Sequence, residues 1–204
     1  MMKRFSLSLM TALTLSAAQF ANGQATAEST NLARQGTEAA KAQDWNKAVD
    51  SFRKATQIDR KNAPNLFAAL QQRAFAYVSQ QKFQEALADF SEALQINPKD
   101  AHIHERRAYV EMKLNDFDKA LADYSEAIKL NPNEIRYYLL RSYIYEVKGD
   151  LKNAMADTDK VLNMDPENAE AQGRKARLQG RPSTPPPGTT PTPVPPSQRK
   201  PGAT

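Results

Sequence analysis

The chain has 204 residues, a formal net charge of +5 from 28 basic and 23 acidic side chains, 13 prolines and no cysteine. This length suits one domain with tails or an elongated repeat array, and it excludes two large globular domains. Without cysteine there is no disulfide, no thiolate metal site and no cysteine nucleophile. Because His102 and His104 are the only two histidines, the chain has almost no side chains for histidine-dependent catalysis.

Residues 1–27 are typical of an export signal. A short basic stretch is followed by residues 5–18, which are apolar with small hydroxyl side chains and no charge. Small residues then offer cleavage sites after Gly23 and after Ala27, which is the layout of a secretory signal peptide. The apolar run is shorter than the about 20 residues that a membrane span needs; an uncleaved N-terminal anchor is the alternative. We therefore expect an exported mature chain without a membrane span, in a bacterial-type periplasm or outside the cell.

A 34-residue period organises the middle of the chain. Segments 83–98, 117–132 and 151–166 align without gaps, and their starts differ by 117 − 83 = 34 and 151 − 117 = 34. A fourth copy precedes them with an offset of 38, so that four residues, about one helical turn, are inserted near 64–67. The residues that recur at equal offsets are Ala86, Ala120 and Ala154; Asp89, Asp123 and Asp157; Pro98, Pro132 and Pro166; and Arg73, Arg107 and Arg141.

Each copy contains two helical patterns. In residues 83–94, apolar side chains recur at i, i+4, i+7 and i+11, which predicts an amphipathic helix. The recurring prolines stop these helices, and short polar side chains stand where they can cap a helix. The expected caps of the second helices are Asp44, Asp116 and Asp150, and those of the first helices are Asn62, Asp100 and Asn168, with Glu134 as a poorer cap. The pattern predicts helix–turn–helix units and no strand.

This pattern resembles the tetratricopeptide repeat family over roughly residues 29–168, with repeats at 29–66, 67–100, 101–134 and 135–168. The residues that match the family's small and aromatic positions are Gly36, Ala74, Ala108 and Ser142; Ala48, Ala86, Ala120 and Ala154; Phe52, Phe90 and Tyr124; and Ala55, Ala93 and Ala127. Three residues depart from the family pattern, namely Thr158, Val161 and Arg60. The resemblance implies an all-α, right-handed superhelical solenoid of four helix–turn–helix repeats.

The period continues beyond the fourth repeat. Lys175 falls one full period after Arg141, so residues 169–180 are expected to form a lone capping helix. Its polar side chains are expected to give the end of the array a solvent-exposed polar face. These side chains are Glu170, Gln172, Arg174, Lys175 and Arg177. Residues 181–204 hold nine of the 13 prolines and no large apolar cluster, which predicts a disordered proline-rich tail.

The basic character belongs to the two ends of the chain. Residues 169–204 carry six basic groups and one acidic group, whereas residues 28–168 carry 20 basic and 22 acidic groups. Nucleic-acid binders gather basic and stacking side chains on one surface, so a nucleic-acid partner is not expected. The tail is either a solubilising spacer or a contact for an anionic polymer. The second possibility defines an alternative function, an envelope protein that binds glycan through its basic C-terminus with the repeats as spacer.

No catalytic, cofactor or metal motif occurs in the sequence. His102 and His104 are two residues apart, whereas metal-binding pairs on a helix stand three or four apart. We interpret them as ordinary histidines of the helix surface or groove. The aspartates and arginines that recur in successive copies keep the period of the repeat, so we interpret them as structural. No enzymatic activity, cofactor or metal is expected.

The resemblance also implies a binding surface. In tetratricopeptide arrays the first helices of the repeats line a concave groove, where Phe75, Tyr109 and Tyr143 would form a row of rings. Such a row can hold an extended peptide or a helix, or it can serve to pack the repeats together. The charged groove positions indicate no preferred sign of partner. The expected groove residues are Phe75, Tyr109, Tyr143, Met112, His102, Glu105, Arg106, Lys113, Arg136 and Glu146.

One partner class of the family is not expected. Repeats that bind the acidic C-termini of cytosolic heat-shock chaperones use a clamp of lysine, asparagine and arginine. The corresponding positions here are Ala33, Thr37, Gln72 and His102, and only Arg106 matches. The expected function is therefore non-catalytic protein–protein binding in the cell envelope, with a different partner peptide or helix in the groove.

Overall fold

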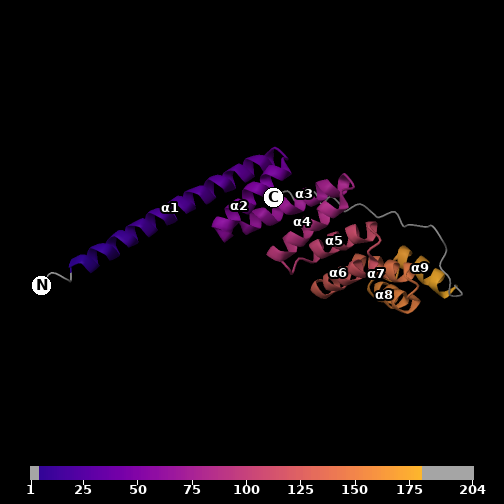
Figure 1. Ribbon diagram of the computed structural model, residues 1–204. Coiled ribbons are helices and arrows are strands. Elements are labelled where there is room, and N and C mark those ends of the chain that lie inside the picture. The colour runs from indigo at the N-terminus through magenta and orange to yellow at the C-terminus, as the bar shows by residue number, and fades with distance from the viewer. Residues whose placement is uncertain (1–4, 181–204) are drawn as a thin grey trace, which may run out of the picture.

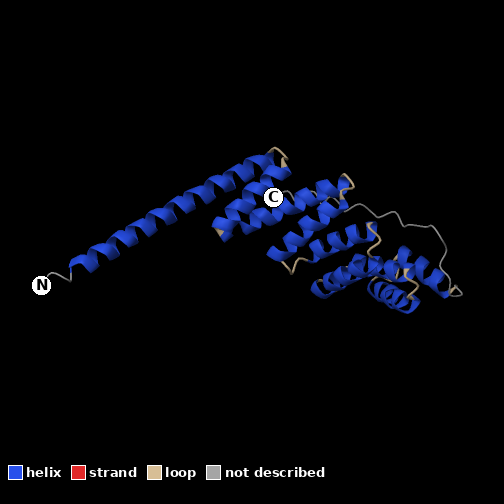
Figure 2. Ribbon diagram, in the orientation of Figure 1, coloured by secondary structure: helices blue, strands red, loops and turns tan. Residues whose placement is uncertain are grey.

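The computed structural model describes residues 5–180, so the proline-rich tail lies outside the described residues. Within 5–180 the chain forms nine α-helices, one 3-10 helix and no strand (Figure 2). The bounds are α1 Phe5–Lys41, α2 Trp45–Ile58, η1 Arg60–Asn62, α3 Ala63–Ser79, α4 Phe83–Ile96, α5 Ala101–Lys113, α6 Phe117–Leu130, α7 Ile135–Val147, α8 Leu151–Met164 and α9 Ala169–Gln179. The all-α repeat fold expected from the sequence is confirmed.

The helices stack as successive antiparallel pairs. α1 packs on α2, α3 on α4, α5 on α6 and α7 on α8, and each second helix also contacts the first helix of the next pair (Figure 1). α9 contacts α8 at the end of the stack. Because each pair packs mainly on its neighbours, the buried apolar residues form three clusters along the array and no single central core.

The first helix is longer than the repeat period predicts. α1 begins at Phe5, whereas the first repeat was expected to begin at Ser29. The cleavage sites expected after Gly23 and Ala27 thus lie within α1, whose N-terminal part extends away from the stack (Figure 1). No helix among the described residues is both long and apolar enough to cross a membrane. The export signal remains a prediction from the sequence.

The four inserted residues lengthen α3. This helix has 17 residues and α5 has 13, and 17 − 13 = 4. Pro64 stands in the first turn of α3, where the backbone N–H that proline lacks would have no acceptor within the helix. The expected cap at Asn62 is wrong, because its side chain makes no capping bond. Its amide instead donates to Ser29 Oγ at 2.9 Å and so joins α1 to the turn before α3.

The other expected caps hold with one exception. Asp44, Asp100, Asp150 and Asn168 each accept a hydrogen bond from a backbone N–H in the first turn of their helix. Asp116 makes no capping bond, and its carboxylate instead accepts a bond of 2.5 Å from the Lys119 ammonium. The prediction at Asp116 is therefore wrong.

Buried arginine–aspartate pairs join the two helices of each repeat from the second to the fourth. In each pair the guanidinium Nε and Nη2 donate to both carboxylate oxygens, over 2.6 to 2.8 Å. The arginines of the third and fourth repeats also donate to a serine of the preceding repeat, at 3.2 and 3.0 Å. The pairs are Arg73–Asp89, Arg107–Asp123 and Arg141–Asp157. The structural interpretation of these recurring residues is confirmed, and we name the three pairs the ion-pair ladder.

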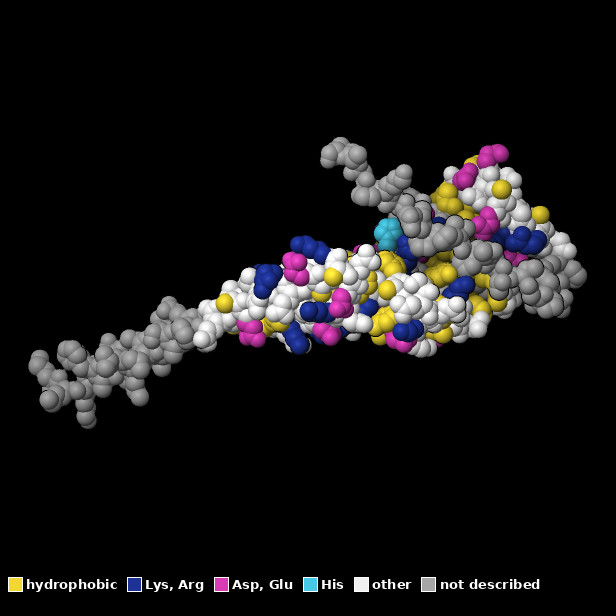
Figure 3. Space-filling model, turned by 90° about the horizontal axis from the view of Figure 1, so that it is seen from above, with side chains coloured by type: hydrophobic (Ala, Val, Ile, Leu, Met, Phe, Trp, Pro, Cys, Tyr) yellow, Lys and Arg dark blue, Asp and Glu magenta, His cyan; other side chains and the backbone are white. Residues whose placement is uncertain are grey.

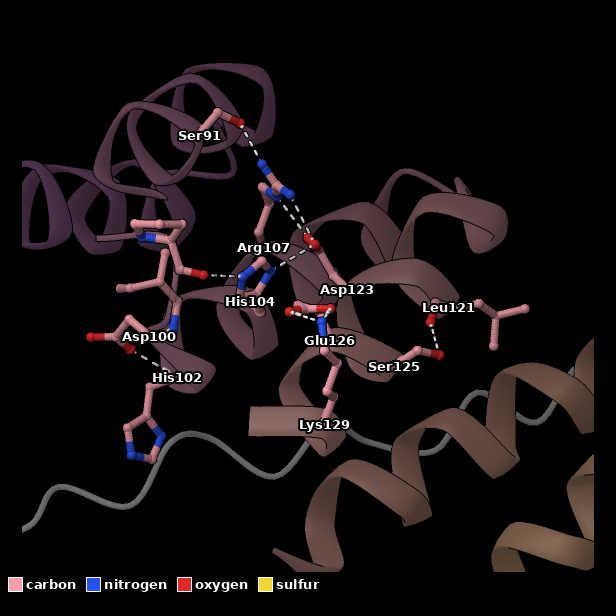
Figure 4. A network of polar contacts seen from close by, with 12 residues as sticks. Ser91, Asp100, His102, His104, Arg107, Leu121, Asp123, Ser125, Glu126 and Lys129 are labelled. Atoms are coloured by element: carbon pink, nitrogen blue, oxygen red, sulfur yellow. Dashed lines mark hydrogen bonds and ion pairs between the residues drawn. The ribbon is translucent and has the colours of Figure 1, made fainter. Parts of the chain in front are cut away.

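A donor six residues after each recurring proline holds the turn between repeats. His104 Nε2 lies 3.1 Å from the carbonyl oxygen of Pro98. At the same offset, Tyr138 donates to Pro132 at 3.1 Å and Gln172 to Pro166 at 2.8 Å. His104 Nδ1 also lies 3.0 Å from Asp123 (Figure 4). The expectation of a surface or groove histidine is therefore wrong for His104, which is buried in the ladder.

Small residues allow the paired helices to approach closely. Ala74, Ala108 and Ser142 are fully buried where the two helices of their repeats meet. Gly36 holds the equivalent place in α1, and a Cβ added there would lie 2.8 Å from the Phe52 ring. The glycine is thus required by the contact between α1 and α2.

We expect Gly36→Ala to lower the free energy of unfolding by about 1–3 kcal/mol, because the methyl group overpacks the contact with Phe52. Gly173→Ala in α9 is the matched control, since its Cβ would meet only Arg177 Nη1, at 3.7 Å. Alanine's better helix propensity should there add about 0.5–1 kcal/mol. Urea unfolding followed by circular dichroism measures both. A gain of stability in Gly36→Ala would contradict the close approach.

We expect the contribution of His104 to stability to depend on pH. The hydrogen bond to Asp123 raises the pKa of His104 above its ordinary value, and the Pro98 carbonyl adds to the effect. Because the folded-state pKa is raised, the protonated histidine contributes fully to the free energy of unfolding below about pH 6.5. This contribution is lost as the pH rises through the folded-state pKa. His104→Gln keeps a donor for Pro98, as Gln172 does for its proline, but has no charge.

The difference in unfolding free energy between the native chain and His104→Gln is therefore largest near pH 6 and below, and shrinks towards pH 9. Chemical unfolding across this window, with Gln172→Ala as the pH-independent comparison, measures it. A difference that is constant or that grows with pH would refute a charged His104.

Candidate partner-binding groove

The three predicted rings lie on successive first helices and are partly exposed. Phe75 is on α3, Tyr109 on α5 and Tyr143 on α7. Phe75 also meets the Phe90 ring edge-on, with 5.8 Å between centroids. Phe75 and Tyr109 pack against the core cluster of the first three repeats, and Tyr143 packs against the next cluster. One part of each ring therefore packs inward and another part faces outward, so the packing use is shown and the binding use stays a prediction.

A cation stands over each ring. The Arg106 guanidinium lies 5.2 Å from the Phe75 centroid, and the Lys113 ammonium lies 5.5 Å from that of Tyr109. Arg174 lies 5.9 Å from Tyr143. Such contacts are attractive, because the ring face carries negative partial charge. Each of the three rings is thus paired with a cation.

Two of these ring–cation pairs share one spacing in the sequence. The offset from Phe75 to Arg106 equals the offset from Tyr143 to Arg174 (106 − 75 = 174 − 143 = 31). In both, the cation comes from the first turns of the next first helix along the stack. At the equivalent position for Tyr109 stands Leu140, and Lys113 of the same helix covers the ring instead. This spacing could have revealed these ring–cation pairs from the sequence.

The carboxylates of the groove are already paired. Glu105 is only 4% exposed, and its Oε1 lies 2.9 Å from Arg136 Nε of the next first helix. Glu146 Oε2 lies 3.7 Å from Arg174 Nε and 3.6 Å from Arg177 Nη2 on α9. These ion pairs link α5 to α7 and α7 to α9 along the groove.

The remaining charge of the groove is positive. Within the described part of the chain, Arg106 and Lys113 make no ion pair with a carboxylate. From the sequence alone, Glu105 and Glu146 count as groups that could meet a partner, so the sequence indicates no preferred sign of the partner's charge. Both carboxylates are neutralised by arginines, so the charge left on these helices is that of Arg106 and Lys113.

The other predicted groove residues divide between the surface and the core. His102 is exposed, with 68% of its side chain accessible, and its Nδ1 lies 3.4 Å from the Tyr137 hydroxyl. It points away from the His104–Asp123 network (Figure 4). Met112 is half-buried, and its Sδ lies 3.6 Å from the Tyr124 hydroxyl. The methionine thus packs towards the core more than an adaptable surface residue would.

Arg174 corrects the expectation of a solvent-exposed polar face on the capping helix. Its residue is 2% exposed, and burial lowers the pKa of its guanidinium. It donates to the carbonyl of Leu139 and to Glu170 Oε1, the latter at 2.9 Å. The sequence predicts an exposed side chain from its polarity alone. In the structure Arg174 packs on α7 instead, against the ring of Tyr143 and the carboxylate of Glu146. It belongs to the end of the groove.

Charges elsewhere on the molecule are mixed. In Figure 3, dark blue and magenta side chains alternate over the visible face and do not gather into a basic stripe. Among the residues that the structure describes, no group of three or more His, Asp or Glu side chains could hold a metal ion. In the predicted groove, rings and uncompensated charge lie together at Phe75 with Arg106 and at Tyr109 with Lys113.

The stacked helix–turn–helix repeats, with rings and charges on their first helices, have the architecture of a protein-interaction module. The profile of the tetratricopeptide repeat family matches residues 72–135 and 105–169. The repeats of this chain belong to the tetratricopeptide repeat family.

Solved structures of this family share the fold. A tetratricopeptide repeat protein from Parabacteroides merdae ATCC 43184 is 26% identical with a TM-score of 0.59, covering 74% of this chain and 59% of its own. YrrB, described as having an unusual peptide-binding site, is 21% identical with a TM-score of 0.56, covering 70% of this chain and 72% of its own. The first repeat domain of Spaghetti (RPAP3), bound to the HSP90 peptide SRMEEVD, is 24% identical with a TM-score of 0.52, covering 55% and 90%. No curated protein matches.

Proposed function

We propose that this chain is a non-catalytic interaction module of the cell envelope that captures an acidic segment of a partner protein in its groove. The observation that supports this most directly is the uncompensated charge of Arg106 and Lys113, each above an aromatic ring. Acidic side chains of the partner would meet these cations, and its apolar side chains would lie on the exposed parts of the rings.

The binding mode would differ from a terminal carboxylate clamp. Ala33, Thr37, Gln72 and His102 stand where such a clamp needs lysine and asparagine. The two uncompensated cations of this groove, Arg106 and Lys113, instead lie about two turns apart on α5, which suits an internal segment or one face of a helix. The peptide bound to the RPAP3 domain supports the capacity of this fold to hold a peptide.

The location rests on the N-terminal sequence. Its basic start, apolar stretch and small residues near 23–27 favour export. In the envelope, the groove would act as a scaffold surface and the proline-rich tail as a spacer.

The glycan-binding alternative is less well supported by the described basic residues of the C-terminal region. Arg174 is buried beneath the groove, and Lys175 pairs with Asp159 at 2.7 Å. Arg177 lies 3.6 Å from Glu146. Because these three groups are engaged within the fold, only the basic groups at 181–204, outside the described residues, would remain for a polymer.

Capture from envelope extract of the source cells tests the groove. We expect the full chain to retain a partner that Phe75→Leu/Tyr109→Leu/Tyr143→Leu loses, because leucine keeps the packing but removes the ring faces. The matched control is Tyr77→Leu/Phe117→Leu/Tyr145→Leu, which removes three half-buried rings from outside the groove. Circular dichroism checks the helicity of each variant.

A chain ending at Gly180 should also keep the partner. If the partner is lost with this truncation and kept by the groove variant, the glycan-type alternative replaces our proposal.

Charge reversal tests the expected sign of the partner. We expect Lys113→Glu to weaken binding of the captured partner by about tenfold or more and to reduce its salt sensitivity. Lys129→Glu on α6 makes the same change in net charge on an exposed side chain outside the groove and should have little effect. Fluorescence anisotropy at about 50 and about 300 mM salt measures both. Tighter binding by Lys113→Glu would contradict an acidic partner.

A further inference from the structure

A pocket of about 360 Å³ lies between α4, α5 and α6, on the side of α5 away from the groove. Glu111, which lines it, is two residues from Tyr109, and two residues turn about 200° around a helix axis. The pocket is also lined by Leu87, Ser91, Arg107, Lys119, Ala122 and Asp123. Pockets of roughly 300–1,000 Å³ accept small organic groups.

The repeats on either side fill the equivalent place with a tyrosine. Tyr77 stands one repeat period before Glu111, and Tyr145 stands one period after it (111 − 77 = 145 − 111 = 34). Tyr77 lies beneath the ladder arginine Arg73, 5.7 Å from ring centroid to guanidinium, and Tyr145 lies beneath Arg141 at 5.9 Å. In the third repeat this position is Glu111, so no ring lies against the ladder arginine Arg107.

The glutamate leaves an unsatisfied acceptor in the pocket. Glu111 is 5% exposed, and its Oε2 is buried without a hydrogen-bond partner. Burial raises the pKa of Glu111 to about 7, and the nearby charge of Asp123 adds to the effect. Leaving a buried acceptor without a donor is unfavourable. A ligand that brings a donor to this oxygen would remove that penalty.

The ladder arginine leaves its flat face available to such a ligand. Arg107 uses its edge to donate to Asp123 and to Ser91 (Figure 4). A guanidinium bonded through its edge can still stack on an aromatic ring. Leu87 and Ala122 supply apolar wall to the pocket.

We propose that this pocket binds a phenolic side chain, that of a tyrosine on a partner protein. Its ring would lie against Arg107, as Tyr77 and Tyr145 lie against the equivalent arginines, and its hydroxyl would donate to Glu111 Oε2. A partner lysine could also donate to Glu111, but it has no ring to lie against Arg107. The phenol meets both requirements of the pocket.

The test uses p-cresol, which is the tyrosine side chain itself, titrated into the isotopically labelled full chain. We expect saturable NMR shifts at the amides of Leu87, Ser91 and Ala122. Toluene, which lacks the hydroxyl, should bind at least about tenfold more weakly, and so should n-butylammonium. Glu111→Gln keeps an acceptor and should bind p-cresol within about threefold of the native chain.

Glu111→Tyr supplies the missing ring from within the chain. It should abolish the p-cresol shifts and raise the thermal midpoint. The groove variant Phe75→Leu/Tyr109→Leu/Tyr143→Leu should bind p-cresol normally, so this site and the groove are tested separately. The proposal is overturned if p-cresol causes no saturable shifts there, if toluene or n-butylammonium binds as tightly, or if Glu111→Tyr leaves p-cresol binding intact.

Discussion

The bidentate pairing of each ladder arginine with an aspartate of the following helix is the interaction on which the rest of the structure depends. It fixes the two helices of a repeat against each other, and the bonds from Arg107 and Arg141 to serines fix that repeat on the one before. Removing one partner of a buried pair leaves an uncompensated charge, typically a loss of about 3–5 kcal/mol. The bidentate pairs and the serine bonds thus fix how far apart successive first helices lie, and with them the groove residues that these helices carry.

The first helices therefore have two different faces. On one side they hold the ladder, and on the other they present the rings and their covering cations. Carboxylates of the groove are used to join neighbouring first helices, as in the ion pair of Glu105 with Arg136. The same contacts that stiffen the array thus leave its groove with positive charge. The third repeat is exceptional on the ladder side, where Glu111 replaces a ring and opens a pocket.

The fold could be predicted because the 34-residue period constrains many positions at once. Recurrence also identified the ladder residues as structural, since a catalytic residue has no reason to repeat with the helices. What failed depends on contacts between repeats. The burial of Arg174 and the role of His104 come from Tyr143 and Pro98, which lie on other elements, and neither contact shows in the polarity of a single helix. The sign of the groove likewise depended on which carboxylates were already paired.

The most direct measurement for the groove is site-specific photo-crosslinking to the captured partner. A photoreactive amino acid would replace His102 in the groove or, separately, Lys129 on α6. The two side chains are similarly exposed, at 68% and 74%, and belong to the same repeat. Our account predicts that the partner is crosslinked from position 102 and not from position 129. Crosslinking from position 129 alone would contradict it.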